Sequence, residues 1–240
     1  MPSGQSPALK LSVVIPVYNE QETIGEVIDR VRSVDLGPIE KEIIVSDDGS
    51  TDGSAEILAE YSNSFPNLVT VHTSPINLGK GAAVRLGMAC ATGDIIIVQD
   101  ADLELDPSEY ARIIAPIVAG QWEVVYGSRF LAKPKGIPLR TRLANRFLTM
   151  LTNVLYGARL SDMETAYKAF RREVVQGLHL RCVRFDFEPE ITAKLLLAGY
   201  HIHEVPIGYT PRTEGEGKKI CLIDGIEAIH TLFRCRFLDH

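Results

Sequence analysis

The chain has 240 residues, of which 45% are hydrophobic and 23% are charged, and its formal net charge at pH 7 is −6. A chain of this size and composition can bury a substantial core, and its negative charge argues against nucleic-acid binding by bulk electrostatics. Residues 1–10 lack the basic and then apolar pattern of a secretory signal, and no apolar run approaches the ~20 residues that span a bilayer, so we expect a cytoplasmic protein.

Short apolar runs alternate with amphipathic segments through the first half of the chain. Residues 1–10 contain several Pro, Ser and Gly residues, which predicts a disordered leader before a single domain at 11–240. The predicted strands are 11–15, 43–45, 69–71, 95–98 and 123–126. The predicted helices are 22–32, 55–61 with a cap at Ser50 or Thr51, 81–91 and 107–118. This order predicts an α/β fold with a mostly parallel sheet covered by helices on both faces.

The second half is less regular. Residues 139–156 are predicted as a helix that ends at Gly157, because glycine suits the position just after a helix. A further helix is predicted at 187–197 and a late strand at 201–206. Residues 212–219 are polar and contain glycine, and we expect them to form a mobile loop.

The segment 139–159 is basic and amphipathic. Its apolar stripe consists of Leu143, Phe147, Leu151 and Val154 or Leu155. The arginines that lie off this stripe are Arg140, Arg142 and Arg146. We expect this segment to lie on an anionic membrane surface and to gather a lipid phosphate acceptor. The alternative is an ordinary packed helix with a solvated basic edge.

Polar and glycine-rich residues follow each of the first five predicted strands. In open parallel sheets, ligands bind beyond the carboxyl ends of the strands, so these residues are the place to look for a site. The five segments are 18–20 (Tyr-Asn-Glu), 47–50 (Asp-Asp-Gly-Ser), 77–81 (Asn-Leu-Gly-Lys-Gly), 100–102 (Asp-Ala-Asp) and 127–129 (Gly-Ser-Arg).

Asp100 and Asp102 form the most informative pair. If the backbone stays extended after the strand, residues two apart point to the same side, and two converging carboxylates need a cation between them. Mg²⁺ and Mn²⁺ prefer such oxygen ligands and also bind substrate phosphates, and Glu104 is a further candidate ligand. The alternative is a solvated acidic loop ahead of the helix that starts at Pro107.

Two basic residues are candidates for phosphate contacts. The 77–81 segment matches neither the dinucleotide-binding glycine pattern nor the Walker A pattern, so we interpret it as a tight turn that brings Lys80 near a phosphate. Arg129 could clamp a diphosphate, because a guanidinium matches phosphate oxygens, although a surface arginine is an equal alternative. The segment 47–50 could also be a simple turn and helix cap.

Taken together, these motifs resemble glycosyltransferase family 2, and within it the dolichyl-phosphate mannose synthase group with its bacterial polyprenyl-phosphate relatives. The resemblance covers about residues 11 to 235 in order. Beside the segments above it includes 14–20 (Val-Ile-Pro-Val-Tyr-Asn-Glu), 187–191 (Phe-Glu-Pro-Glu-Ile) and 204–207 (Glu-Val-Pro-Ile). The resemblance implies the GT-A fold.

The resemblance also implies roles for single residues. The residues that would hold the nucleoside of a GDP- or UDP-sugar are Pro16, Tyr18, Glu20, Val45 and Asp47. Those that would hold the diphosphate with Mg²⁺ or Mn²⁺ are Asp100, Ala101, Asp102 and Glu104. Arg129 would contact the donor, and Arg212 and Lys218 would close over the phosphates from the late loop.

The implied reaction is the inverting transfer of a hexose, mannose or glucose, to a polyprenyl or dolichyl phosphate. Such an acceptor needs no strong base, because its phosphate is already anionic. A hydroxyl acceptor on a polysaccharide or other glycan would need a base, for which Asp162, Glu188 and Glu190 are the candidates. A non-catalytic nucleotide-sugar-binding subunit is a third alternative. A peripheral contact with the inner face of a membrane and a homodimer are left open.

Overall fold

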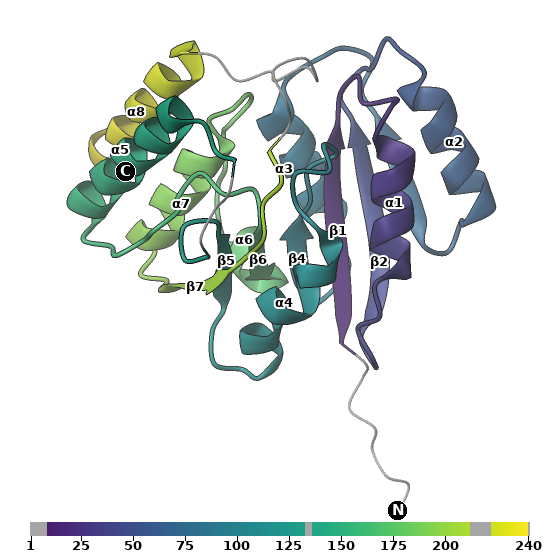
Figure 1. The fold of residues 1–240 in the computed structure, drawn as a ribbon, viewed down its shortest axis with the longest axis horizontal. Helices are drawn as coiled ribbons and strands as arrows, with labels where there is room; N and C mark the ends of the chain where they lie inside the picture. Colours follow the sequence, from purple (N-terminus) through teal and green to yellow (C-terminus); the bar gives the residue numbers. More distant parts are fainter. Residues whose placement is uncertain (1–8, 133–135, 212–221, 240) are drawn as a thin grey trace, which may run out of the picture.

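The computed structural model describes residues 9–132, 136–211 and 222–239 (Figure 1). Its strands are β1 (Lys10–Val17), β2 (Glu40–Asp47), β3 (Val69–Thr73), β4 (Ile95–Val98), β5 (Val124–Ser128), β6 (Lys168–Arg171) and β7 (Ile202–Pro206). Its helices are α1 (Ile24–Ser33), α2 (Ser54–Ser64), α3 (Lys80–Cys90), α4 (Tyr110–Val118), α5 (Leu139–Tyr156), α6 (Arg172–Gln176), α7 (Phe187–Leu197) and α8 (Leu222–Phe237). A 3₁₀ turn, η1 (Pro107–Glu109), precedes α4.

The described residues form one seven-stranded sheet in the order β3-β2-β1-β4-β6-β5-β7. Strands β1, β2, β3 and β4 pair in parallel, as do β5 and β7, whereas β6 runs antiparallel to both of its neighbours. The carboxyl ends of β1, β2 and β4 therefore meet at one edge of the sheet, which is the edge where the sequence predicts a site.

Both faces of the sheet are covered, because consecutive residues of its central strands alternate between two apolar cores. Val13 and Ile15 of β1 face the core formed with α1, α2 and α4, whereas Val14 faces the core formed with α3 and α7. Burial on both faces explains why these strands read as continuous apolar runs. The predicted α/β fold with a mostly parallel sheet and helices on both faces is confirmed.

A third core lies outside the sheet, where α5 and α8 pack on α7 (Figure 1). It is formed by small and medium-sized apolar side chains from the three helices, among them Leu148, Ala193 and Leu232. Gly157 follows α5 with a left-handed φ of 68°, as its position after the predicted helix requires. None of the described helices combines the length and the apolar content needed to span a membrane.

Several sequence-based predictions need correction. Strand β1 begins at Lys10, inside the predicted leader, and residues 1–8 lie outside the described part of the chain. Neither Ser50 nor Thr51 caps α2, because Gly53 occupies the N-cap position and Ser50 instead bonds to Asp47. Strand β6 and helices α6 and α8 were not predicted.

The close approach of α3 to the sheet depends on Gly87. A Cβ at this position would overlap the Val14 side chain and lie 3.0 Å from Ser46 Oγ. We expect Gly87→Ala to lower the free energy of unfolding by about 1–3 kcal/mol in urea denaturation, because the helix must move off the strands. Gly225→Ala in α8, where a Cβ meets nothing within 4 Å, is the matched control and should raise the free energy of unfolding by about 0.5–1 kcal/mol. Equal effects of the two substitutions would contradict this account.

Candidate active site

The loops that follow β1 and β2 are joined by hydrogen bonds. Asn19 has a left-handed φ of 53°, and its Oδ1 accepts from the Thr51 N–H at 2.7 Å while its own N–H donates to Ser50 Oγ at 3.0 Å. The Glu20 N–H donates to Ser54 Oγ at 3.0 Å. These bonds fix Tyr18 and Glu20 beside the end of β2, as expected for residues that contact one ligand.

Asp47 ends β2 and lies opposite Val17 in the parallel register. Its Oδ1 accepts from the N–H and hydroxyl of Ser50 at 3.0 and 2.6 Å. Its Oδ2 is buried and has no hydrogen-bond partner, and such an atom carries a large cost unless a ligand supplies a donor. Pro16 and Val45 are buried in the adjoining strands, so all five predicted nucleoside residues lie at this one edge.

Asp48, unlike Asp47, accepts hydrogen bonds from the backbone of the loop that precedes α3. Its two carboxylate oxygens accept from the Leu78 N–H at 2.9 Å and the Gly79 N–H at 2.6 Å. Gly79 has a φ of 112°, and a Cβ there would lie 2.5 Å from the Val183 carbonyl oxygen. The tight turn predicted for this segment is therefore confirmed, and it delivers Lys80 as the first residue of α3.

Lys80 links two acids from distant parts of the chain. Its Nζ lies 2.9 Å from Asp100 Oδ2 and 2.8 Å from Glu188 Oε1. Burial alone would lower the pKa of Lys80, but the two carboxylates outweigh it, so the pKa lies above its ordinary value. Burial would likewise raise the pKa of Glu188, but Lys80 and Lys168 hold it below its ordinary value. Glu188 is thus a charged carboxylate and a weak base.

The loop after β4 is held by the buried side chain of Gln99. Its Oε1 accepts from the hydroxyls of Tyr110 and Tyr167 at 2.7 and 2.6 Å, and its Nε2 donates to the Asp100 carbonyl at 2.9 Å. Burial raises the pKa of both tyrosines, which keeps them protonated donors. Ala101 is buried, so the loop is anchored between Asp100 and Asp102.

The reason given for pairing Asp100 with Asp102 is wrong. Strand β4 ends at Val98, and the following residues turn, with Leu103 at a φ of 60°. Asp100 Oδ2 binds Lys80, whereas its Oδ1 is buried without a hydrogen-bond partner. Asp102 Oδ1 accepts from the Glu104 N–H at 3.1 Å. The turn, and not an extended strand, sets the directions of these acids.

Glu104 is oriented by the segment that follows β7. The Tyr209 hydroxyl donates to Glu104 Oε2 at 2.9 Å, and burial together with this carboxylate raises the pKa of Tyr209. The carboxylates of Asp100, Asp102 and Glu104 do not all lie within 4.8 Å of one another. The arrangement therefore does not bring Glu104 in as a third metal ligand beside the two aspartates.

Arg129 and Asp162 form a buried, bidentate ion pair. The Nε and Nη2 of Arg129 lie 2.7 and 2.8 Å from the two Asp162 oxygens, and the Arg129 N–H also donates to Asp162 at 3.0 Å. Glu204 accepts from the Asp162 N–H at 2.9 Å. Asp162 is fully buried and both of its carboxylate oxygens pair with Arg129, so it could act as the predicted base only if this pair separated. The Arg129 guanidinium is therefore fixed in position. Its Cζ also lies over the Tyr209 ring, 5.3 Å from the ring centroid.

Glu164 lies close to these charges and was not predicted. Its neighbours include Arg129, Lys168 and Glu188, and its Oε1 is buried without a hydrogen-bond partner. Burial and then the Glu188 charge raise the pKa of Glu164 to about 7. Lys168, fully buried in β6, donates to the carbonyl oxygens of Met163 and Thr165.

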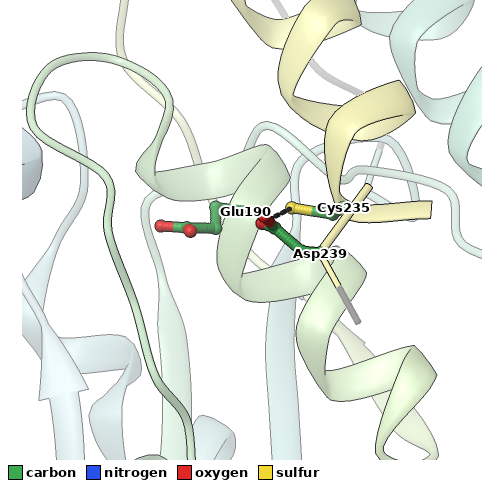
Figure 2. Close-up of side chains that lie close together, drawn as sticks. All are labelled: Glu190, Cys235 and Asp239. Carbon is green, nitrogen blue, oxygen red and sulfur yellow. Dashed lines mark hydrogen bonds between the residues drawn. The ribbon is translucent and has the colours of Figure 1, made fainter. Parts of the chain in front are cut away.

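Glu190 points to a different part of the molecule. Among the described residues, Glu190, Cys235 and Asp239 bring three ligand-type atoms within 4.8 Å of one another between α7 and the end of α8 (Figure 2). The Glu190 carboxylate already accepts from two backbone N–H groups before α7 and pairs with Lys194 at 2.8 Å and Arg234 at 3.3 Å. These cations leave no place for a metal ion. Glu190 ties α7 to α8, and the structure does not bring it to Lys80 and Asp100, where a base would be needed.

A scan against family models matches residues 12–178 to the model described as "Glycosyl transferase family 2". The chain belongs to glycosyl transferase family 2. The matched range spans β1 to α6 and contains the joined loops after β1 and β2, Lys80, the Asp100–Asp102 turn and the Arg129–Asp162 pair. The resemblance seen in the sequence is confirmed at this level.

The solved structures similar to this family 2 transferase include glucosyl-3-phosphoglycerate synthase from Mycobacterium tuberculosis. One of its crystal structures has 23% identity and a TM-score of 0.74, and the match covers 95% of this chain and 81% of that one. A second, in complex with Mn²⁺, UDP and phosphoglyceric acid, has 24% identity and a TM-score of 0.72, with coverages of 95% and 78%. The likeness supports the GT-A type of fold. It does not single out the dolichyl-phosphate mannose synthase group.

Arg212 and Lys218 lie outside the residues that the structure describes, as does the loop predicted at 212–219. The sequence reasoning missed Gln99, Tyr209 and Glu164. For Gln99 a signal existed, because a polar residue between the apolar β4 and Asp100 must find buried partners. Tyr209 and Glu164 carried no local signal, since their partners come from distant segments.

Glu164 gives the transferase a specific pH dependence. A carboxyl group whose pKa is raised by folding, here to about 7, binds more protons in the folded chain, so stability falls as the pH rises from about 4.5 to 7. We expect Glu164→Gln to remove this slope and to raise the free energy of unfolding at pH 8 by about 1–3 kcal/mol in urea denaturation. Glu173→Gln, at an exposed carboxylate, should leave the slope unchanged. A slope that survives Glu164→Gln would contradict the assignment.

Proposed function

We propose that this chain is a metal-dependent, inverting glycosyltransferase that moves a hexose from a nucleoside diphosphate sugar to a polyprenyl phosphate. One observation carries the proposal. At the carboxyl end of β4, Asp100 has one oxygen bound by Lys80 and the other buried without a partner. A buried and unpaired carboxylate oxygen beside a second aspartate fits a divalent cation, which supplies the missing positive charge.

The donor set suits Mg²⁺ or Mn²⁺, because it consists of carboxylate oxygens only. Asp100 and Asp102 would hold the ion, which when bound would neutralise charge on the departing diphosphate. Lys80 adds a fixed positive charge beside Asp100. Arg129, held by Asp162, would add a second cation to contact the donor.

The nucleoside would occupy the edge formed by the ends of β1 and β2. The unpaired Asp47 Oδ2 is an acceptor that matches an N–H of a base, and the joined loops around Asn19 place Tyr18 beside it. UDP and UDP-glucose are named as bound molecules in the M. tuberculosis synthase structures, and this supports a UDP-sugar over a GDP-sugar. Glucose is accordingly the favoured hexose.

The acceptor is proposed to carry a phosphate. The similar synthase was crystallised with phosphoglyceric acid, a phosphorylated acceptor that also offers a hydroxyl group. A polyprenyl phosphate presents an anionic oxygen that can attack the anomeric carbon without a strong base. The pairing of the predicted bases supports an acceptor that needs no strong base. Asp162 is paired with Arg129, and the ion pair with Lys80 makes Glu188 a weak base.

A transfer to a hydroxyl group is the second candidate, and Glu164 is the observation that favours it. Its pKa of about 7 is the value that suits a general base near neutral pH. Glu188, the base predicted from the sequence, would have to leave Lys80 to accept a proton. A purely binding, non-catalytic subunit is disfavoured, because it has no need for the buried and uncompensated Asp100 oxygen.

Asp102→Ala tests the proposed site directly. Loss of one of two metal-holding carboxylates should reduce turnover by at least about a thousandfold, since stabilisation of the diphosphate by a cation contributes several kcal/mol. The thermal unfolding midpoint should shift little, because Asp102 is half-buried in the turn that follows β4 and lies outside the packed strands and helices. Product would be measured by mass spectrometry with UDP-glucose, polyprenyl phosphate and Mg²⁺ or Mn²⁺. Turnover equal to the unsubstituted protein would contradict the proposed site.

The nature of the acceptor is tested with Glu164→Gln. For a polyprenyl phosphate acceptor we expect kcat to change less than tenfold, because no proton has to be removed by the protein. For a hydroxyl acceptor, loss of a general base should cost a factor of about 10²–10⁴. The two acceptors would be offered to the same preparation across pH 5.5–8.5. A large loss confined to the hydroxyl acceptor would establish the second candidate function.

A further inference from the structure

Helix α5 exposes the apolar stripe that would normally be packed. Its apolar side chains between 49% and 75% exposed are Leu139, Leu143, Phe147, Met150 and Val154. At about 100° per residue these positions fall on one face of the helix, opposite the buried Leu148, Thr149 and Thr152. The predicted stripe is therefore divided: Leu143, Phe147 and Val154 face solvent, whereas Leu151 and Leu155 pack against the third core.

Arginines border this stripe on both sides. On the helical wheel Arg146 and Arg142 lie along one border and Arg140 lies along the other. The 18 residues of α5 include no Asp or Glu, although the whole chain has a net charge of −6. An apolar stripe with basic borders is the pattern of a helix that lies in the plane of a membrane interface.

The neighbouring helix α8 extends the exposed apolar surface. Its exposed apolar side chains are Ile223, Ile226, Phe233 and Phe237, and Leu238 follows them. Helices α5 and α8 lie side by side at the outer corner of the molecule (Figure 1). The Tyr156 hydroxyl donates to the Leu232 carbonyl at 2.6 Å and fixes the two helices together. Two neighbouring helices that both expose large apolar side chains indicate an interaction site.

We propose that this α5–α8 surface, defined by the exposed apolar side chains named above and the three arginines of α5, docks on an anionic lipid membrane. Charge complementarity decides between the available occupants. A second copy that paired the two α5 helices across a two-fold axis would place arginines against arginines, because α5 contains no acid. Anionic lipid headgroups complement these arginines, and the acyl region accepts the apolar stripe.

The α5–α8 surface begins shortly after Arg129 in the chain, which suits an acceptor dissolved in a membrane. Residues 130–138 connect Arg129, at the end of β5, directly to the first turn of α5. Helices α5 and α8 lie toward the same end of the molecule as the carboxyl ends of β1 and β2 (Figure 1). Docking requires neither donor nor metal, so it stands or falls independently of the proposed function.

Vesicle flotation tests the surface without any substrate. The full chain would be mixed with vesicles of phosphatidylcholine alone or of phosphatidylcholine with phosphatidylglycerol. We expect binding to the anionic vesicles and a loss of about fivefold for each of Arg140→Gln and Arg146→Gln, reduced by high salt. Leu143→Asn and Phe147→Asn should weaken binding by at least about tenfold, because the apolar stripe provides the insertion energy.

Matched controls lie on the far face of the sheet. Val118→Asn on α4 and Arg30→Gln on α1 alter an exposed apolar and an exposed basic side chain and should leave flotation unchanged. Circular dichroism would verify that all variants fold. Flotation of the α5 variants at the level of the unsubstituted protein would overturn the proposal. So would an unsubstituted protein that binds no vesicle but sediments as a dimer that Phe147→Asn dissociates, which would assign the surface to a second copy.

Discussion

One ammonium group organises the chemistry of this molecule. Lys80 at the start of α3 reaches both Asp100 after β4 and Glu188 in α7. Two carboxylates so close to each other would repel, and without a cation between them one would take up a proton. Lys80 bonds to both acids and leaves Asp100 Oδ1 buried without a hydrogen-bond partner. A single side chain thereby connects the acid that follows β4 with α7 in the second half of the chain.

The other charges around the site are divided into fixed and adjustable groups. Arg129 and Asp162 form a bidentate ion pair, and Glu204 accepts from the Asp162 backbone N–H, so the positions of both side chains are fixed. Glu164 differs from this pair. Its Oε1 is buried without a hydrogen-bond partner, and its pKa lies near neutrality. The protonation of Glu164 therefore changes near neutral pH.

The sequence predicted those features that depend on local patterns. Ile95–Val98, Leu139–Tyr156 and Phe187–Leu197 were predicted with the same bounds as β4, α5 and α7, because apolar runs and periodicity are local. Strand β6 was missed because the buried Lys168 interrupts its pattern, and its ammonium is satisfied by carbonyl groups that only the fold supplies. The pairing of Asp162 with Arg129 was missed for the same reason. Its partner Arg129 is distant in sequence, and no pattern reveals such a pairing.

The position of β6 has a consequence for how the chain is made. Strand β4 pairs with β1 on one side, but its other side is completed by β6, which follows β5 and α5 in the chain. During synthesis the first four strands therefore emerge with an open sheet edge, because Lys168–Arg171 is made only later. An unpaired apolar edge invites wrong pairing, and this stage is the period at which a nascent chain most needs a chaperone.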